Sequence, residues 1–216
     1  MKELPKQYPF IYVITDERFL NVFNIYEAVE RAILGGAKVV QYRAKKKTTK
    51  EMLEEALLVR EATRHHDALF IVNDRLDLAL AAEADGVHLG QDDLPVEYAK
   101  EIAGENFIVG LSTHNLEQVE EANRKKEFID YIGFGPVFPT TTKENPDPVV
   151  GVENLCRAVE ISELPVVAIG GIFKENIKEV AACRPAGIAV VRAAFEKGDP
   201  YENMRELLSS LNSLKH

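Results

Sequence analysis

Short apolar runs alternate with amphipathic stretches along the whole chain, and this alternation limits its possible folds more than any other feature. Most of the runs are rich in Val, Ile, Leu, Phe or Tyr and are bounded by polar residues or glycine, as β-strands are. Strands that alternate with helices favour parallel βα units in one fold rather than separate domains. Eight strands are predicted, at Phe10–Thr15, Val39–Tyr42, Leu69–Val72, Gly86–Leu89, Phe107–Leu111, Tyr131–Phe134, Val166–Ile169 and Ile188–Val191.

The stretches between the strands have apolar residues at spacings of three and four, which is typical of helices that bury one face. Thr49 and Asn115 stand where helix N-caps are expected, and Gly35-Gly36 marks the end of the first helix. The clearest predicted helices cover Ile25–Leu34, Lys50–Thr63 and Leu116–Arg124.

Eight βα units in 216 residues predict an α/β fold, a (β/α)8 TIM barrel that occupies residues 1–216 as a single domain. An open doubly wound sheet is the alternative architecture. In a barrel, polar residues that directly follow the strands gather at one end, which is where barrel active sites lie. The residues after each strand are therefore the candidates for function.

The composition argues against several classes of partner. The chain carries 26 basic and 35 acidic residues, a net charge of −9, and its densest basic run is Lys45-Lys46-Lys47. Small-molecule substrates are therefore expected rather than nucleic acid or an anionic membrane, and both a monomer and a homo-oligomer remain open. No apolar run approaches the ~20 residues of a membrane span and no signal-peptide core is visible, so a cytoplasmic protein is expected.

Cys156 and Cys183 are the two cysteines of the chain. They lack the spacing of metal ligands and are too few for a disulfide framework. We expect two free thiols packed in helices, as in a reducing compartment.

The segment Tyr131–Lys143 runs from an apolar strand into three threonines and a lysine. Hydroxyls, backbone N–H groups and an ammonium at a strand end suit phosphate oxygens. Thr140, Thr141, Thr142 and Lys143 are therefore predicted to bind an anion. A solvated, threonine-rich surface loop is the alternative.

Gln41, Arg43 and Lys45 follow the second predicted strand at alternate positions. In extended backbone such residues lie on one side, which places an amide and two cations together. This arrangement suits a diphosphate, because a guanidinium can bind two oxygens at once. An edge of solvated charges is the alternative.

Carboxylates follow the third and fourth predicted strands. Asn73-Asp74 comes directly after one, and Asp92-Asp93 follows the other. Mg²⁺ commonly uses one or two carboxylates together with substrate phosphates, so Asp74 and Asp93 are predicted to bind it, with Asp92 as the competing second ligand. Helix capping by Asp74 and a turn at Asp92-Asp93 are the alternatives.

The remaining strand ends offer hydroxyl and glycine positions. Ser112 and His114 follow the fifth strand, and Gly170-Gly171, after the seventh, leaves backbone free to approach a phosphate. His114 is interpreted as a polar lining or cap residue, and His88 as a hydrogen-bonded core histidine. Together these strand ends predict a site for a Mg²⁺-bound diphosphate beside a second, phosphate-bearing ligand.

At this point the chain closely resembles the thiamine-phosphate synthase family, also called thiamine-phosphate pyrophosphorylase, over nearly its whole length. That family joins 4-amino-5-hydroxymethyl-2-methylpyrimidine diphosphate to a thiazole phosphate, giving thiamine phosphate and pyrophosphate. The stretches that carry the resemblance are Tyr12–Asp16, Gln41–Lys45, Val72–Arg75, Ala84–Asp93, Ser112–His114, Gly133–Lys143 and Val167–Ile172.

The resemblance also implies roles for individual residues. Asp74 and Asp93 would bind Mg²⁺, and catalysis would fall to Arg43, Lys45, Ser112 and Lys143. The pyrimidine diphosphate would be held by Gln41, Arg43, Lys45, Asn73, Ser112 and Lys143. The thiazole phosphate would be held by Thr140, Thr142, Gly171, Val191 and Arg192.

The family reaction is thought to begin when the C–O bond to diphosphate breaks and leaves a pyrimidine methylene cation that the thiazole nitrogen captures. Such a reaction needs charge neutralisation at the leaving pyrophosphate rather than a protein nucleophile. The inventory of cations and carboxylates, with no recognisable Ser-His-Asp arrangement, agrees with this chemistry.

Position 192 departs from the family pattern, because the usual residue there is serine. The Arg192 guanidinium either turns into the site and binds phosphate, or turns away and pairs with Glu196 four positions on. Two other functions are alternatives: a thiazole tautomerase of the same superfamily, whose members tend to carry a histidine where this chain has Pro136, and a non-catalytic barrel that binds thiamine precursors.

Overall fold

The computed structural model of the chain is a closed barrel of parallel strands, in the order β1 to β8 around the ring. It describes residues 3–6, 8–20, 23–142 and 147–212. Strand β1 pairs with both β2 and β8, so the (β/α)8 prediction is confirmed and the open sheet is excluded. The strands are β1 Phe10–Ile14, β2 Ala37–Tyr42, β3 Leu69–Asn73, β4 Gly86–Leu89, β5 Ile108–Thr113, β6 Tyr131–Phe134, β7 Val166–Ile169 and β8 Gly187–Val190.

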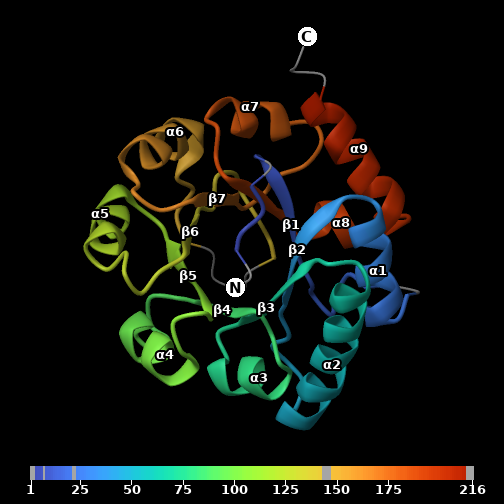
Figure 1. Cartoon of the computed structure of the whole chain (residues 1–216). Helices are drawn as coiled ribbons and strands as arrows, with labels where there is room; N and C mark the ends of the chain where they lie inside the picture. Colours follow the sequence, from blue (N-terminus) through green and yellow to red (C-terminus); the bar gives the residue numbers. More distant parts are fainter. Residues whose placement is uncertain (1–2, 7, 21–22, 143–146, 213–216) are drawn as a thin grey trace.

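Helices cover the outside of the strand ring (Figure 1). A short helix, α8, directly follows β8, and α9 lies beside α1. The helices are α1 Ile25–Leu34, α2 Thr49–His65, α3 Leu76–Ala81, α4 Val96–Ala103, α5 Leu116–Arg124, α6 Gly151–Ile161, α7 Ile177–Ala182, α8 Arg192–Phe195 and α9 Pro200–Asn212.

The helix caps follow local sequence closely. Asn115 caps α5 as predicted, and α1 ends at Gly35, where a Cβ atom would lie 2.7 Å from the Met204 Cβ of α9. The N-cap of α2 was predicted one residue too late. Thr48, rather than Thr49, forms a capping box with Glu51, because only a residue three positions before Glu51 can exchange both hydrogen bonds with it.

The barrel has two apolar layers, which together cover both faces of the strands. In β1, Tyr12 and Ile14 belong to the inner layer, whereas Ile11 and Val13 belong to the outer layer that packs against the helices. Both faces of the strands are therefore largely buried, which explains why the strands read as almost continuous apolar runs in the sequence.

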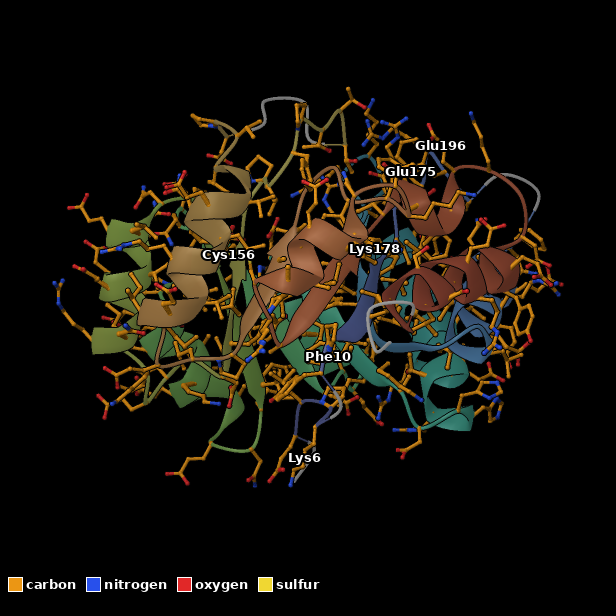
Figure 2. All side chains as sticks on the ribbon, turned by 90° about the horizontal axis from the view of Figure 1, so that it is seen from above. Lys6, Phe10, Cys156, Glu175, Lys178 and Glu196 are labelled. Carbon is orange, nitrogen blue, oxygen red and sulfur yellow. A yellow bond between two sulfur atoms is a disulfide. The ribbon has the colours of Figure 1, made fainter. Side chains whose placement is uncertain are left out.

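Cys156 in α6 and Cys183 at the C-terminal end of α7 form a disulfide, with Cα atoms 4.5 Å apart. The prediction of two free thiols was wrong, because residues separated by 27 positions meet only when neighbouring helices of the barrel pack together. Figure 2 shows Cys156 in the helical layer, away from the barrel axis. The cysteines therefore give no support to a reducing compartment.

The two ends of the barrel carry different parts of the chain. Figure 2 shows Lys6 below the end where β1 begins at Phe10, whereas Glu175 and Glu196, which follow β7 and β8, lie toward the opposite end. That opposite end collects the residues that follow the strands. Within the described part of the chain, every helix is too short or too polar to cross a membrane.

Candidate functional site

A cavity of about 650 Å³ opens among the carboxyl ends of the strands. This volume is within the usual range for small-molecule sites, roughly 300–1,000 Å³. The cavity is lined by all of the predicted site residues that the structure describes: Gln41, Arg43, Lys45, Asn73, Asp74, Asp93, Ser112, Thr140, Thr142, Gly171, Val191 and Arg192. Lys143, the remaining predicted residue, lies outside the described residues.

The predicted row of Gln41, Arg43 and Lys45 does lie on one side of its segment, facing the cavity. Each of the two cations is held by a carboxylate. Arg43 Nη1 donates to Asp16 at 3.0 Å, and Lys45 Nζ donates to Asp74 at 2.6 Å. Arg43, whose side chain is 18% exposed, is therefore held in place, whereas Lys45, at 51%, stays partly solvated.

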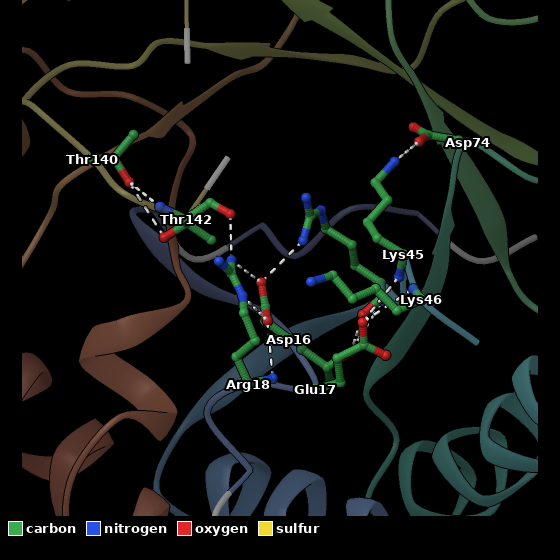
Figure 3. Close-up of polar contacts among 10 residues, drawn as sticks. Asp16, Glu17, Arg18, Lys45, Lys46, Asp74, Thr140 and Thr142 are labelled. Carbon is green, nitrogen blue, oxygen red and sulfur yellow. Dashed lines mark hydrogen bonds and ion pairs between the residues drawn. The ribbon is translucent and has the colours of Figure 1, made fainter. Parts of the chain in front are cut away.

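Asp16, which follows β1, links Arg43, which lines the cavity, to Arg18; Figure 3 shows its contacts with Arg18. Its side chain is only 3% exposed, and it accepts hydrogen bonds from Arg18 Nε at 2.9 Å and Arg18 Nη2 at 2.7 Å as well as from Arg43. Sequence reasoning gave Asp16 no role. The signal was present, because Asp16 is a charged residue directly after an apolar strand.

The charge state of Asp16 follows from its partners. Burial acts to raise the pKa of this carboxyl, but the hydrogen bonds and charge of Arg18, with the charge of Arg43, outweigh burial and leave the pKa below its ordinary value. Asp16 is therefore a carboxylate at neutral pH, and it holds the guanidinium of Arg43 in place.

Arg18 also connects the loop after β1 to the threonine segment after β6. Its Nη2 atom donates to the backbone carbonyl of Thr142, as Figure 3 shows. In the same segment, Thr142 N–H donates to Thr140 Oγ1 at 3.3 Å, and the two hydroxyls lie 3.3 Å apart. Thr140 and Thr142 are thus parts of one turn, which Arg18 holds from the loop after β1.

Asp74 and Asp93 form a pair of carboxylates beside Lys45. Burial, followed by the nearby charge of Asp74, raises the pKa of Asp93. Asp93 Oδ2 also accepts from Gly90 N–H at 2.7 Å, so the predicted turn role is present too. Asp74 does not cap α3, because that helix begins after Arg75 and has no side-chain cap. The backbone of Asp74 has a φ of 61°, which is a rarely populated conformation.

These two carboxylates are a suitable set for Mg²⁺. A divalent cation offsets the charge of two neighbouring carboxylates, and oxygen ligands suit this ion. Among the described residues, no cluster of three or more His, Cys, Asp or Glu side chains could hold a metal. A cation here would therefore complete its shell with water and ligand oxygens.

A row of polar side chains crosses the floor of the cavity. Gln41 Nε2 donates to the Tyr12 hydroxyl at 2.7 Å, and the Tyr12 and Tyr131 hydroxyls lie 2.8 Å apart. His88 contacts the Tyr131 hydroxyl through Nδ1 at 3.0 Å and Ser112 Oγ through Nε2 at 2.9 Å. His88 is hydrogen-bonded as expected, although it lines the cavity rather than the closed core.

Burial sets the protonation states on this floor. It raises the pKa values of the Tyr12 and Tyr131 phenols above their ordinary value, and it lowers the pKa of His88 to about 4. At neutral pH the two phenols keep their protons and the imidazole is uncharged.

Gly170 and Gly171 are required by the packing of two loops. Gly171 has a φ of 63°, and a Cβ there would lie 2.5 Å from the Pro139 carbonyl oxygen. Gly170 accepts a hydrogen bond from Phe138 N–H at 3.0 Å. The glycine backbone after β7 therefore packs directly on the loop after β6, beside Thr140.

Arg192, directly after β8, pairs with Glu196 at 2.8 Å and donates from Nη1 to the Thr141 hydroxyl at 3.2 Å. Its guanidinium also stacks over the Phe173 ring, 5.6 Å from the centroid. The structure thus has the ion pair of the turned-away arrangement, although the side chain stays at the wall of the cavity. Val191 precedes it as the N-cap of α8.

Fold and site together define a class: barrel enzymes with a small-molecule site at the carboxyl ends of their strands. A family model described as thiamine monophosphate synthase matches residues 11–194. The chain belongs to this family, and it is a transferase.

Individual relatives agree over almost the full chain. A thiamine-phosphate synthase of Persephonella marina is 50% identical over 198 residues, which are 91% of this chain and 93% of that one. One from Dictyoglomus turgidum is 44% identical, over 95% of this chain and 92% of that one. The solved thiamine phosphate pyrophosphorylase of Pyrococcus furiosus superposes with a TM-score of 0.85 at 44% identity, covering 96% of this chain and 97% of that one.

Proposed function

We propose that this chain condenses 4-amino-5-hydroxymethyl-2-methylpyrimidine diphosphate with a thiazole phosphate, releasing pyrophosphate and giving thiamine phosphate. In this reaction the bond between the pyrimidine methylene carbon and the diphosphate oxygen breaks, and its electron pair leaves with pyrophosphate. The thiazole nitrogen then donates its electron pair to the methylene carbon. The proposal rests on the family and on the residues that line the cavity.

The observation that carries the proposal is the pair of cations, Arg43 and Lys45, each fixed by its own carboxylate at one side of the cavity. Charge develops on the diphosphate as the C–O bond breaks, and the Arg43 guanidinium, already held by Asp16, stabilises that charge without reorganisation. Ser112 and Asn73 add polar contacts beside them. Lys143, outside the described residues, is assigned to the same task from the sequence alone.

Asp74 and Asp93 would hold Mg²⁺, which when bound neutralises charge on the diphosphate oxygens. The Lys45 ammonium donates to one oxygen of Asp74 at 2.6 Å. We therefore expect Lys45 to move from the carboxylate to the diphosphate when the charged ligand arrives, since the ligand offers more negative charge than a single carboxylate.

The thiazole phosphate is assigned to the part of the cavity that follows β6, β7 and β8, where Thr140, Thr142, Gly171, Val191 and Arg192 lie. Barrels often bind phosphate after the seventh and eighth strands, which here lead into Gly171 and Val191. With each ligand held by its charged group, the two rings meet over the floor, and this positioning lowers the entropic part of the barrier.

The direct test supplies both substrates with Mg²⁺ and follows thiamine phosphate by mass spectrometry. Product is expected only when all three components are present. Binding of both precursors without any product would contradict the proposal and favour a non-catalytic barrel. Isomerisation of the thiazole compound alone would instead favour the tautomerase.

The metal assignment is tested by Asp74→Asn and Asp93→Asn, with Asp92→Asn as the matched control. Each of the first two changes should lower turnover about 10²-fold or more and raise the Mg²⁺ concentration needed for half-maximal rate, because one charge of the pair is lost. The control, one residue away and lining the same cavity, should stay within about threefold of the unaltered enzyme. Unchanged Mg²⁺ dependence in both variants would remove these residues from the metal site.

A further inference from the structure

The polar groups on the cavity floor form an unbroken line of hydrogen bonds that joins Gln41 to Ser112. The contacts run from the Gln41 amide through the Tyr12 and Tyr131 hydroxyls to the two nitrogens of His88, and then to Ser112 Oγ. Five side chains from five strands or strand ends take part, with all four distances between 2.7 and 3.0 Å. The line therefore couples two residues on different sides of the cavity.

The hydrogen bonds along this line must all be donated in the same direction. Each phenol carries one proton, and a neutral imidazole carries one proton on one of its two nitrogens. Each hydroxyl along the line can therefore donate to only one neighbour and must accept from the other. Whichever end supplies the first proton decides the direction of every bond that follows.

Two directions are available. If the Gln41 amide donates to Tyr12, then Tyr131 donates to His88 Nδ1, and His88 Nε2–H donates to Ser112 Oγ. The Ser112 proton is then free for a ligand. In the reverse direction, the Ser112 hydroxyl donates its only proton to His88 Nε2, so only its lone pairs face the cavity.

The charges around the cavity favour the first direction. An anion held by Arg43 and Lys45 attracts a hydroxyl proton and is repelled by hydroxyl lone pairs. The structure also has Gln41 Nε2, rather than its carbonyl oxygen, against Tyr12. We propose that Tyr131 is a positioning residue, which fixes the Nε2–H form of His88 and so directs the Ser112 hydroxyl proton toward the anionic ligand.

The neighbouring strands are shaped around this contact. A Cβ atom at Gly110 would lie 2.3 Å from Tyr131 Cζ and 2.5 Å from His88 Nδ1. A Cβ atom at Gly133 would lie 3.1 Å from His88 Cε1. Two strands thus lack side chains where the phenol and the imidazole meet, which is independent evidence that this contact is specified by the sequence.

The first test reads the tautomer of His88 in the ligand-free protein by ¹⁵N NMR of the imidazole nitrogens, with His88→Gln to assign the signals. A proton on Nε2 and a bare Nδ1 are expected. A proton on Nδ1, or a mixture of the two forms, would overturn the proposed direction. This measurement needs no variant of Tyr131 to fold and no substrate.

The second test is Tyr131→Phe, which removes only the hydroxyl. Its matched control is Tyr42→Phe, since the Tyr42 hydroxyl is also buried but bonds Glu55 outside the cavity. Tyr131→Phe should convert His88 to a mixture of tautomers and lower kcat about tenfold, with KM nearly unchanged. Tyr42→Phe should leave the tautomer and kcat as they were.

A single Nε2–H form in Tyr131→Phe would refute the positioning role. So would equal losses of kcat in the two variants, because that result indicates general destabilisation. The proposal uses the proposed function only for the anionic nature of the ligand. If the unaltered protein makes no thiamine phosphate, that function fails while the tautomer measurement still decides the direction of the hydrogen bonds.

Discussion

Replacing Asp16 by asparagine separates the positioning of Arg43 from its charge. The amide has the same shape as the carboxylate, but one oxygen that accepts hydrogen bonds becomes an NH₂ group. Asp16 Oδ2 accepts from Arg18 Nη2 at 2.7 Å and from Arg43 Nη1 at 3.0 Å. An NH₂ group at that position faces two N–H donors, so both hydrogen bonds are lost and Arg43 is no longer held by Asp16.

The magnitude follows from the number and exposure of these bonds. Two charge-assisted hydrogen bonds are worth about 1.5–3 kcal/mol each when buried. The Arg18 side chain is 40% exposed, so water can replace part of its lost hydrogen bond, whereas the Arg43 side chain is only 18% exposed. We expect the free energy of unfolding to fall by about 2–4 kcal/mol, in line with the cost of breaking a largely buried ion pair.

The loss of activity in Asp16→Asn should be larger than the unfolded fraction of the variant can explain. A guanidinium that is no longer held against the leaving pyrophosphate loses its preorganisation, so kcat for the condensation should drop about 10²-fold under conditions where the variant is fully folded. Urea unfolding gives the stability change, and the initial rate of pyrophosphate release with both substrates and Mg²⁺ gives kcat.

The chain offers a matched control in Asp85→Asn. Asp85 directly precedes β4, at the end of the barrel away from the cavity, and its 8% exposed side chain accepts from Arg60 and from Phe70 N–H, both at 2.9 Å. It should lose comparable stability and keep its kcat, because this end of a barrel serves stability rather than chemistry. Equal kcat in the two variants, at whatever level, would refute the positioning role of Asp16.

Three further predictions rest on other contacts. Arg192→Ser should change the affinity for thiazole phosphate by less than about twofold, because Glu196 already neutralises the guanidinium; a tenfold loss, about 1.4 kcal/mol, would make Arg192 a direct phosphate ligand. Reducing the Cys156–Cys183 disulfide should lower the free energy of unfolding by about 3–4 kcal/mol, as expected for a loop of this length. A thiol reagent should detect no free thiol in the unreduced, unfolded chain, and detection of two would show that the disulfide is absent. Between pH ~6.5 and about 4 the unfolded chain binds a proton at His88 that the folded chain does not, so the free energy of unfolding should fall as pH falls, by up to about 1.4 kcal/mol per pH unit. The measurement is the urea midpoint at pH 7 and at pH 5, each compared with that of His88→Gln. If the difference between the two proteins is the same at both pH values, the prediction is wrong.

Sequence alone predicted the architecture and many of the polar residues that line the cavity. The ends of α1 at Ile25 and Leu34, and those of α5 at Leu116 and Arg124, are as predicted, because caps and apolar spacing are local properties of the chain. The row from Gln41 to Lys45 was also predictable, since alternate residues of extended backbone share a side and barrel strands bring their carboxyl ends together.

Tertiary structure decided which of those residues touch. The disulfide joins Cys156 to Cys183 across two βα units, Asp16 holds Arg43 from a neighbouring strand end, and Tyr131 meets His88 over 43 positions of sequence. None of these contacts follows from spacing along the chain. They depend on the packing of the strands and helices in the barrel, which sets the distances between elements and so determines the partner of each charged or polar group.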